Sequence, residues 1–385
     1  MPYVDPELLR ERLFDVLSFY YPTCRDESVG GHVAQIAEET GDVYDPDPRH
    51  LVATCRFVSN FALGATLDGP DWCPSAARHG LAFLESAHRQ EDDGYAWLLD
   101  GRDVADDRRS PYGHAFVLLA HARAAAANVD GAEPDRVATL LDDRFRNENG
   151  LLGPVQGPDW DPRESYRGQN PNMHACEAFL AAYEATDDEA FLERSLAIAR
   201  RMTVDLADDE GRIWEHYTAD WEPDYDYNRD EHEHQFRPWG FQPGHHAEWA
   251  KLLAGLAHHR DDDWLLARAR ELFDEALTGW DAALGGFHYT LDFDGEPVIA
   301  DKYGWPVAEA IGAAAALFEH TQERQYRERY DQFWDYAETN LVASGGNWYA
   351  KLDAENERVP TDEGPAVEPG YHPIGACYEG LRAFE

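Results

Sequence analysis

The sequence contains almost no lysine. Only Lys251, Lys302 and Lys351 occur among 385 residues, and 75 acidic residues against 33 Lys and Arg give a formal net charge of −42. Such a surface repels phosphate backbones and anionic lipid headgroups, which argues against nucleic acid and membrane partners. The acids are spread along the whole chain and do not form one tail. We therefore expect a halophilic protein, whose self-repulsion is screened by concentrated salt.

Several site signatures are also missing. The five cysteines are an odd number without paired metal spacing, so we expect buried, reduced thiols in a cytoplasmic protein. The first 22 residues carry acids on an amphipathic helical pattern, which predicts neither a signal peptide nor a membrane span. The stretch "GATLDGPD" lacks the residues of a phosphate loop or dinucleotide fingerprint, so we predict no cofactor. His232 and His234 have the spacing of loop ligands, but no paired cysteines or HExxH helix accompany them, and we predict no metal site.

Helical apolar periodicity dominates what is present. It is clearest in "YGHAFVLLAHARAAAA" and "AEAIGAAAALFEHT", while strand alternation appears only in short pieces such as "GGFHYTLDF". A Gly-centred turn recurs six times, beginning at Gly30, Asp93, Asn149, Glu210, Gly285 and Gly345. Each turn follows a charged amphipathic helix pattern and precedes a more apolar one. We therefore predict an all-α fold, an (α/α)6 barrel of six outer and six inner helices with short β-hairpin loops. An open solenoid would need atypical terminal caps, so we expect one closed domain over residues 1–385.

Polar and aromatic residues stand near the start of each apolar helix pattern. They are Arg56, His114, His174, His245 with Glu248, Trp305 with Glu309, and His372. Parallel inner helices would gather these positions at one end of a central cavity. A single such histidine favours a structural role, because imidazole readily caps a helix or binds a buried carbonyl. The shared register favours a site containing His174, His245 and His372, whereas His114 is equally compatible with a pocket wall and with packing.

The stretch "GFQPGHHAEW" shows how such a position arises. Pro243 and Gly244 predict a helix start, which places His245 in the first turn and Glu248 about one turn later. This spacing pairs an imidazole with a carboxylate.

Neutral imidazoles in a deep cavity suit proton transfer at a carbon next to a carbonyl, because a base with a near-neutral pKa can take and return a proton. Helix N-termini that point into the cavity would favour the anionic enediolate. These features indicate sugar isomerisation or epimerisation. An inverting glycoside hydrolase would need two carboxylates about 6.5–9.5 Å apart, for which Glu248 and Glu309 are candidates, but it would leave the histidines unused. A non-catalytic partner-binding protein is a third class, which the acidic charge disfavours.

The chain resembles the N-acylglucosamine 2-epimerase superfamily, and within it the mannose isomerase and sulfoquinovose isomerase branch. The matching segments are "YRGQNPNMHACEAFLAAYEAT", "WEHYTADWEPDYDYNRDEHEHQFRPWGFQPGHHAEWAKLL", "GGFHYTLDFDGEPV", "WPVAEAIGAAAAL" and "GYHP". This resemblance implies a six-fold α/α barrel and a cofactor-free 1,2 proton shift through a cis-enediol. It implies an aldose–ketose isomerase of the D-mannose/D-fructose type acting on a free monosaccharide. A sugar 2-epimerase (mannose/glucose or N-acyl-hexosamine) and a sulfoquinovose isomerase are the alternatives; monomer and homo-oligomer are both left open.

The resemblance also implies roles for individual residues. His372 and His245 would be the acid/base pair, Glu248 would orient or polarise His245, and His174 would assist ring opening. The substrate-binding residues would be Arg56, Tyr112, Asn170, Arg237, Trp305 and Glu309, with Tyr112 and Trp305 as walls of the pocket. One departure is Gly304, where this branch has a histidine before the tryptophan, and we expect the missing side chain to enlarge the pocket.

Overall fold

The computed structural model describes residues 2–234, 236–361, 364 and 366–385. These residues are mostly helical, as predicted, with a few short strands. They form two compact units. Unit 1 comprises Met1–Val16, Ala199–Thr361 and His372–Glu385, and unit 2 comprises Leu17–Ile198 and Asp362–Tyr371. The expectation of a single domain over residues 1–385 stays a prediction.

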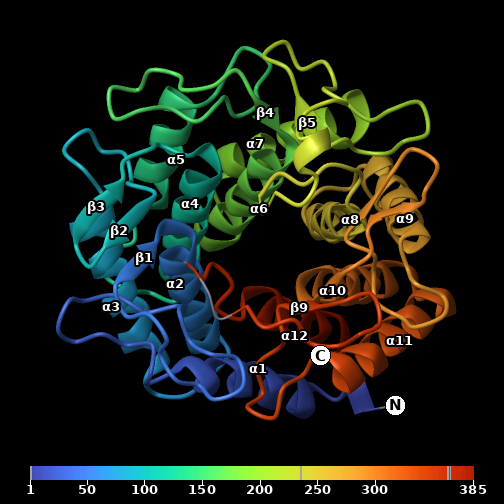
Figure 1. The fold of residues 1–385 in the computed structure, drawn as a ribbon, viewed down its shortest axis with the longest axis horizontal. Helices are drawn as coiled ribbons and strands as arrows, with labels where there is room; N and C mark the ends of the chain where they lie inside the picture. Colours follow the sequence, from blue (N-terminus) through green and yellow to red (C-terminus); the bar gives the residue numbers. More distant parts are fainter. Residues whose placement is uncertain (1, 235, 362–363, 365) are drawn as a thin grey trace. The chain divides into compact units, whose positions relative to one another are not determined.

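In unit 2, three apolar helices lie next to one another and more polar helices cover them (Figure 1). The apolar helices are α2 (Leu51–Thr66), α4 (Pro111–Ala126) and α6 (Gln169–Thr186), and the polar ones are α3 (Cys73–Phe83), α5 (Pro134–Arg144) and α7 (Glu189–Arg200), whose last two residues belong to unit 1. A π-helical turn, η2 (Leu84–His88), continues α3. Strands β1 (Pro48–His50), β2 (Leu98–Asp100) and β3 (Asp103–Asp106) form an antiparallel sheet, and β4 (Arg167–Gly168) precedes α6. Most residues of α2 and α4 are buried, as expected for inner helices.

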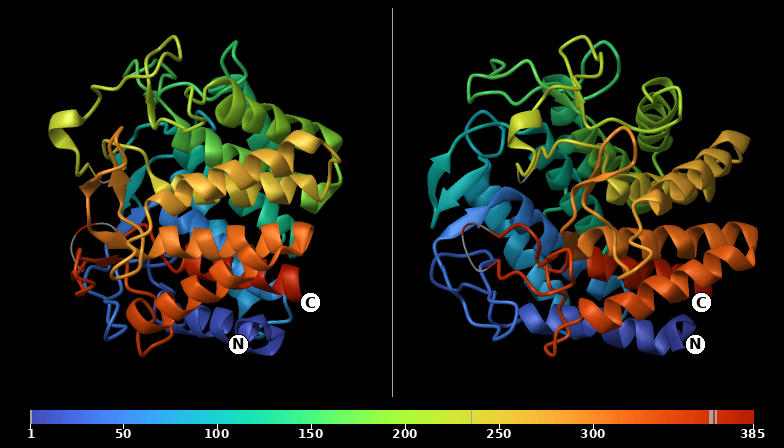
Figure 2. Two further views of the ribbon diagram at one scale, coloured as in Figure 1. Left: turned by 90° about the vertical axis from the view of Figure 1, so that its right-hand side faces the viewer. Right: turned by 45° about the vertical axis from the view of Figure 1, so that its right-hand side comes forward.

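Unit 1 repeats this arrangement with α8 (Pro243–Ala257) beside α10 (Gly304–Thr321), where α9 (Asp263–Thr278) covers α8 and α11 (Arg324–Asn340) covers α10 (Figure 2). It also holds most of α1 (Pro6–Tyr20) and of α12 (Tyr371–Phe384). Its short elements are η1 (Pro2–Val4), η3 (Arg201–Asp205), η4 (Arg229–Glu231), β5 (His216–Tyr217), β6 (Thr290–Leu291), β7 (Pro297–Ile299), β8 (Lys302–Tyr303) and β9 (Lys351–Leu352). Strand β6 pairs with β7, and β8 pairs with β9.

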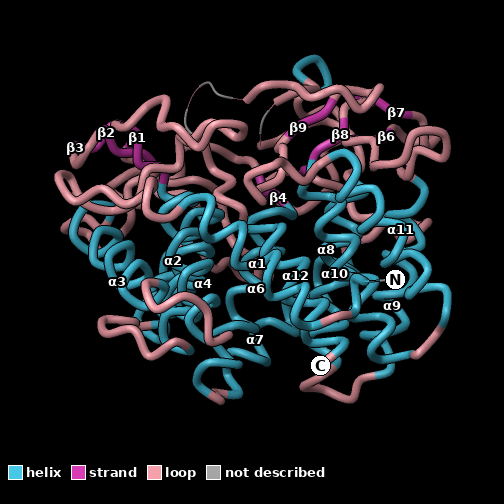
Figure 3. Tube along the Cα trace, turned by 90° about the horizontal axis from the view of Figure 1, so that it is seen from below, coloured by secondary structure: helices cyan, strands magenta, loops and turns pink. Residues whose placement is uncertain are grey.

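Local chemistry fixes where the inner helices begin. The side chain of Ser110 accepts a hydrogen bond from the amide of Gly113, 3.3 Å away, and Pro111 is the first residue of α4. His50 caps α2 in the same way through Nδ1. Helix α8 begins at Pro243, as the sequence predicts, because proline suits a first turn whose amides have no helical partner. Within each unit the strands and long loops lie at the end where these helices begin (Figure 3).

Each of the six Gly turns contains a residue with positive φ: a glycine in five of them, and Asp93, at 65°, in the other. Gly31, Gly150, Gly211, Gly286 and Gly346 all have positive φ, between 71° and 90°. In the last turn the amide of Ala343 donates to the carbonyl of Asn347, and the amide of Gly346 donates to the carbonyl of Ala343. Glycine meets this conformation without the steric cost that a side chain would add. The turn therefore sets the direction in which each long loop returns to the next inner helix.

Two further expectations concern the cysteines and membrane-spanning helices. All five cysteines are buried, and none forms a disulfide, as predicted. Among the described residues, every helix is too short or too polar to cross a bilayer.

Substituting Gly346 by alanine tests the turn. A Cβ at this position would lie 2.8 Å from Cβ of Asp15 and would force a positive φ on alanine. Gly295 is the matched control, since its φ is also positive, at 81°, but a Cβ there would meet nothing within 4 Å. We expect Gly295→Ala to cost about 1–2 kcal/mol of unfolding free energy, and Gly346→Ala to cost about 1–3 kcal/mol more. Urea denaturation in concentrated KCl measures both, and equal losses would contradict the packing argument.

Candidate active site

His372, the second residue of α12, faces a carboxylate on α10. Its Nδ1 lies 2.7 Å from Oε1 of Glu309, and both side chains are buried. Because a carboxylate only accepts hydrogen bonds, Nδ1 carries the hydrogen and Nε2 is the nitrogen that can exchange a proton. The ammonium of Lys251 on α8 donates to the other oxygen of Glu309, Oε2. Glu309 thus joins an imidazole to a buried cation.

The charge state of Glu309 follows from these contacts. Burial would raise its pKa, but the charge of Lys251 and the hydrogen bond from His372 outweigh burial and leave the pKa below its usual value. The sequence analysis placed Glu309 among the substrate-binding residues. In the structure its two oxygens contact His372 and Lys251.

His245, in the first turn of α8, has a carboxylate partner that the sequence analysis missed. Its Nδ1 lies 2.9 Å from both oxygens of Glu215, which is buried in the loop just before β5. The prediction gave this orienting role to Glu248. In the structure, one oxygen of Glu248 instead lies within 4.8 Å of ligand atoms of both Glu309 and His372.

Trp305, the second residue of α10, contacts both imidazoles. Its ring centroid is 5.1 Å from that of His245 and 5.7 Å from that of His372. The first turns of α8, α10 and α12 therefore meet in unit 1, as the helix-start register predicts. A substrate against Trp305 would lie beside two imidazoles whose Nδ1 atoms face carboxylates.

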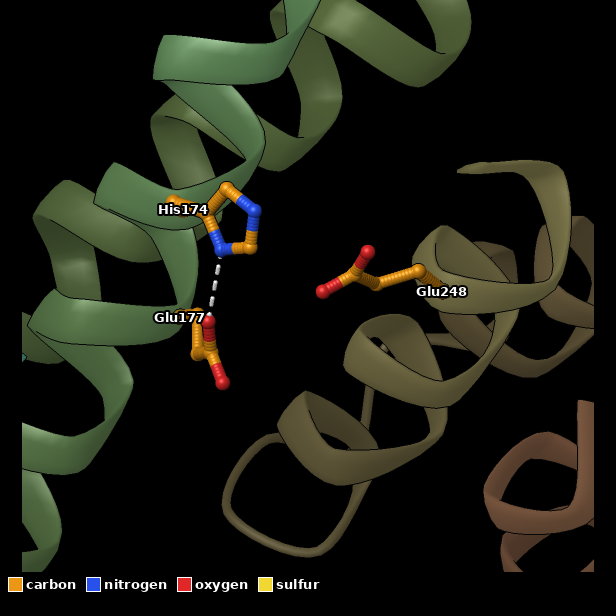
Figure 4. A group of neighbouring side chains, drawn as sticks. All are labelled: His174, Glu177 and Glu248. Atoms are coloured by element: carbon orange, nitrogen blue, oxygen red, sulfur yellow. Dashed lines mark hydrogen bonds and ion pairs between the residues drawn. The ribbon is translucent and has the colours of Figure 1, made fainter. Parts of the chain in front are cut away.

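Unit 2 holds the third predicted histidine. Nδ1 of His174 lies 2.9 Å from Oε2 of Glu177, one turn later on α6 (Figure 4). The hydroxyl of Tyr371 donates to the other oxygen, Oε1. The figure also labels Glu248, which comes from α8. His174 thus has the same Nδ1–carboxylate arrangement as His245 and His372.

Arg56 lies against two aromatic rings in unit 2. Its guanidinium carbon is 4.6 Å from the ring centroid of Phe116 and 4.8 Å from that of Tyr371. The same guanidinium donates to the carbonyl of Val367 and to the carboxylate of Glu368. These contacts hold a positive charge in a fixed, buried place.

The other predicted binding residues have different surroundings. The ring centroid of Tyr112 is 5.3 Å from that of His174. Oδ1 of Asn170 is buried without a hydrogen-bond partner among the described residues, as a group that awaits a ligand would be. In unit 1, Arg237 donates to the hydroxyl of Tyr227 at 2.7 Å.

Two histidines near helix starts are structural. Nε2 of His114 accepts from the amide of Tyr95 at 3.1 Å, and its Nδ1 donates to the carbonyl of Ser110 at 2.7 Å. His246 does the same with Ile213 and Gln242. Burial lowers the pKa of each imidazole to about 4. Both tie the loop after a Gly turn to an inner helix. Of the two roles left open for His114, these contacts favour packing over a pocket wall.

Part of the site has the donor chemistry for a metal. Glu248, Glu309 and His372 offer two carboxylates and an imidazole within 4.8 Å of one another, a set that suits several divalent metals. However, the Lys251 ammonium already contacts Glu309, and a divalent cation there would meet its charge. The residues fit a site neutralised by lysine better than one that holds a metal. His232 and His234 belong to neither metal-compatible group found among the described residues.

The structure argues against two further expectations, a glycoside hydrolase and a pocket enlarged at Gly304. Glu248 and Glu309 have oxygens within 4.8 Å of each other, closer than the spacing of about 6.5–9.5 Å that an inverting glycoside hydrolase requires. A Cβ at Gly304 would lie 2.8 Å from the carbonyl oxygen of Tyr349. The backbone of Tyr349 thus occupies the space beside Gly304, and the expected enlargement of the pocket is not present at that point.

Several known proteins resemble this chain in sequence and in structure. The model of the N-acylglucosamine 2-epimerase family matches residues 31–376. A D-mannose isomerase of Marinomonas mediterranea is 39% identical over 98% of this chain and 97% of its own length. Another D-mannose isomerase, from Thermobifida fusca, is 42% identical over 79% of this chain and 77% of its own length.

A solved structure of a D-mannose isomerase superposes with a TM-score of 0.96 at 37% identity, covering 99% of both chains. A cellobiose 2-epimerase from Bacillus thermoamylovorans, 17% identical, shares the fold with a TM-score of 0.83 over 97% of this chain and 99% of its own. These likenesses confirm the predicted fold class, the all-α (α/α)6 barrel. With a family match over most of its length, the chain belongs to the N-acylglucosamine 2-epimerase family.

Proposed function

We propose that this chain is an aldose–ketose isomerase that interconverts D-mannose and D-fructose. Relatives named D-mannose isomerase, at 39% and 42% identity, support this function. The observation that carries it is the placement of His245 and His372, each with a carboxylate on Nδ1, against the same tryptophan. Two oriented imidazoles provide the base and the acid that a 1,2 proton shift needs.

The reaction follows from the two rings. Nε2 of His372 takes the C2 proton of open-chain mannose, and the electron pair of the C2–H bond forms the C1=C2 double bond while O1 takes a proton from His245. The O2 hydroxyl of the resulting cis-enediol then gives its proton to His245 as the C2=O2 double bond forms. The electron pair of the C1=C2 double bond takes the proton held by His372 at C1, which gives fructose. His245 and His372 stand in the first turns of α8 and α12, where the positive end of the helix dipole stabilises an anionic enediolate.

We propose supporting roles for the other residues. Glu215 orients His245, and Glu309 orients His372. His174 assists ring opening, while Arg56, Asn170 and Arg237 bind sugar hydroxyls. Tyr112 and Trp305 provide apolar ring surface. Glu248, whose carboxylate lies near that of Glu309, adds negative charge beside His372.

A sugar 2-epimerase is the second candidate. Family members include enzymes of that name, and two imidazoles near one tryptophan are compatible with proton delivery to either face of C2. The product distinguishes the two: mannose gives fructose in an isomerase and glucose in an epimerase.

Hydrogen exchange tests the acid/base pair. We expect His245→Ala and His372→Ala each to lower exchange of the C2 hydrogen of mannose in heavy water by at least about 10²-fold, because a positioned acid or base contributes that much. Proton NMR in concentrated KCl follows the exchange and identifies the product. His258→Ala is the control, since His258 caps the opposite end of α8 and should leave the rate unchanged.

The same experiment contains a metal control. The wild-type rate should persist in EDTA, because Lys251 supplies the positive charge beside Glu309. Exchange that persists in either alanine variant removes that histidine from the pair, and loss in EDTA with recovery on adding a divalent ion overturns the metal-free mechanism.

Glu215→Gln tests whether Glu215 orients His245 or binds the sugar. The amide keeps the size of Glu215 but removes the negative charge that fixes Nδ1–H of His245, so we expect kcat to fall on the order of 10²-fold with little change in KM. Steady-state kinetics with mannose give both constants. A large rise in KM with unchanged kcat would instead make Glu215 a sugar-binding residue.

We also propose that the protein works in a cytoplasm of high salt. The formal charge of −42 destabilises the folded chain unless salt screens it. Lowering KCl from about 2 M to about 0.1 M lengthens the screening distance to about 10 Å, and we expect the urea midpoint to fall. Circular dichroism measures the midpoint, with sucrose added at equal osmolality as the control. An unchanged midpoint at low salt would rule out the halophilic interpretation.

A further inference from the structure

Lys251 contacts the carboxylate that pairs with His372. Its ammonium donates to Oε2 of Glu309, and Oε1 of the same carboxylate faces Nδ1 of His372 at 2.7 Å. The side chain of Lys251 is 11% exposed and that of Glu309 is 2% exposed. The three groups therefore form a chain from a cation through a carboxylate to an imidazole, in surroundings that screen charge poorly.

The burial of this lysine needs a reason. The chain keeps only three lysines, and moving an ammonium out of water is unfavourable unless its partners compensate. A positive charge is needed here because oxygens of Glu248 and Glu309 lie within 4.8 Å of each other. Two buried carboxylates so close tend to retain a proton between them. The charge of Lys251 opposes this, and the pKa of Glu309 is accordingly below its usual value despite complete burial.

The charges of Glu309 and Lys251 affect the protonation of His372. A carboxylate beside an imidazole favours the protonated ring, which cannot act as a base. A cation on the far side of that carboxylate offsets its charge. We propose that Lys251 is a positioning residue for His372: by balancing Glu309 it keeps His372 the neutral base that takes the C2 proton. This inference rests on the proposed isomerase function.

The charged groups around the pair come from three helices of unit 1. Helix α8 provides His245, Glu248 and Lys251, and α10 provides Glu309. Helix α12 provides His372 and Glu379. A Cβ on Gly312 would lie 3.1 Å from Cδ of Lys251 and 3.4 Å from Cγ of Glu379, so both side chains pass this glycine. Glu379 has a cation of its own, Arg382, at 3.7 Å.

The two proposed catalytic imidazoles thus have unlike surroundings. Glu215 turns both oxygens toward Nδ1 of His245, whereas Glu309 gives one oxygen to His372 and the other to Lys251. Glu309, the partner of His372, is the carboxylate that contacts this cation, in keeping with the proposed role of His372 as the base at the start of the mannose reaction.

The pH profile of kcat/KM tests Lys251. Lys251→Met and Lys251→Gln remove the cation, while Lys251→Arg keeps it. Without the cation the His372–Glu309 pair holds a proton up to higher pH, so the acid limb should move up by about 1 pH unit. One unit below the wild-type limb, kcat/KM would then fall about tenfold relative to wild type. The alkaline plateau of KM should not change, and the arginine variant should keep the wild-type limb.

NMR titration of the His372 ring provides the second measurement. Its 13Cε1 shift should report the same upward movement in the two neutral variants. An unmoved limb and an unmoved titration, with activity merely lower, would show that Lys251 only packs, and the inference would be wrong. A wild type that makes no ketose would overturn the proposed function instead, and the ring titration would still decide the charge relation.

A further variant covers the case in which the neutral lysine variants do not fold. Glu309→Gln removes the carboxylate charge and keeps the ammonium, so the His372 ring should titrate at lower pH than in wild type. A titration at the same or higher pH would overturn the inference.

Discussion

The hydrogen bond between a carboxylate and Nδ1 of an imidazole is the interaction on which the proposed chemistry depends. His174, His245 and His372 each make it, and in each ring it leaves Nε2 as the nitrogen that can exchange a proton. The carboxylates come from different places: the same helix for His174, the preceding loop for His245, and a neighbouring helix for His372. Helices α6 and α10 hold Glu177 and Glu309, and the loop that follows the Gly turn at Gly211 holds Glu215.

The family and the fold class, and with them the proposed isomerase function, were predictable because their signals are local and repeated. Helical periodicity and the six Gly turns describe one unit many times over, and the motif around His245 and Glu248 is specific. The same kind of signal misassigned a partner. The spacing His-x-x-Glu occurs at His174 and again at His245, yet only at His174 does the structure place that glutamate on Nδ1.

The missed residues are those chosen by tertiary packing. Glu215 lies 30 residues before His245, and no helical spacing relates the two. It lies four residues after Gly211, and the other Gly turns have no carboxylate at that position, so the repeat does not mark it. Lys251 had a weaker signal, three residues after Glu248 on the same helix face, but its contact is with Glu309 on another helix. Periodicity indicates which face of a helix is buried, but it does not indicate which neighbouring residues that face contacts.

The few lysines have a practical consequence for handling the protein. Each is ion-paired with an acid: Lys251 with Glu309, Lys302 with Asp281 and Lys351 with Asp301. Lys302 is fully buried, and Lys351 is 25% exposed. Reagents that couple to amines, whether fluorophores, cross-linkers or activated resins, therefore find hardly any accessible side chain, and carboxyl-directed coupling is the better way to label or immobilise this molecule.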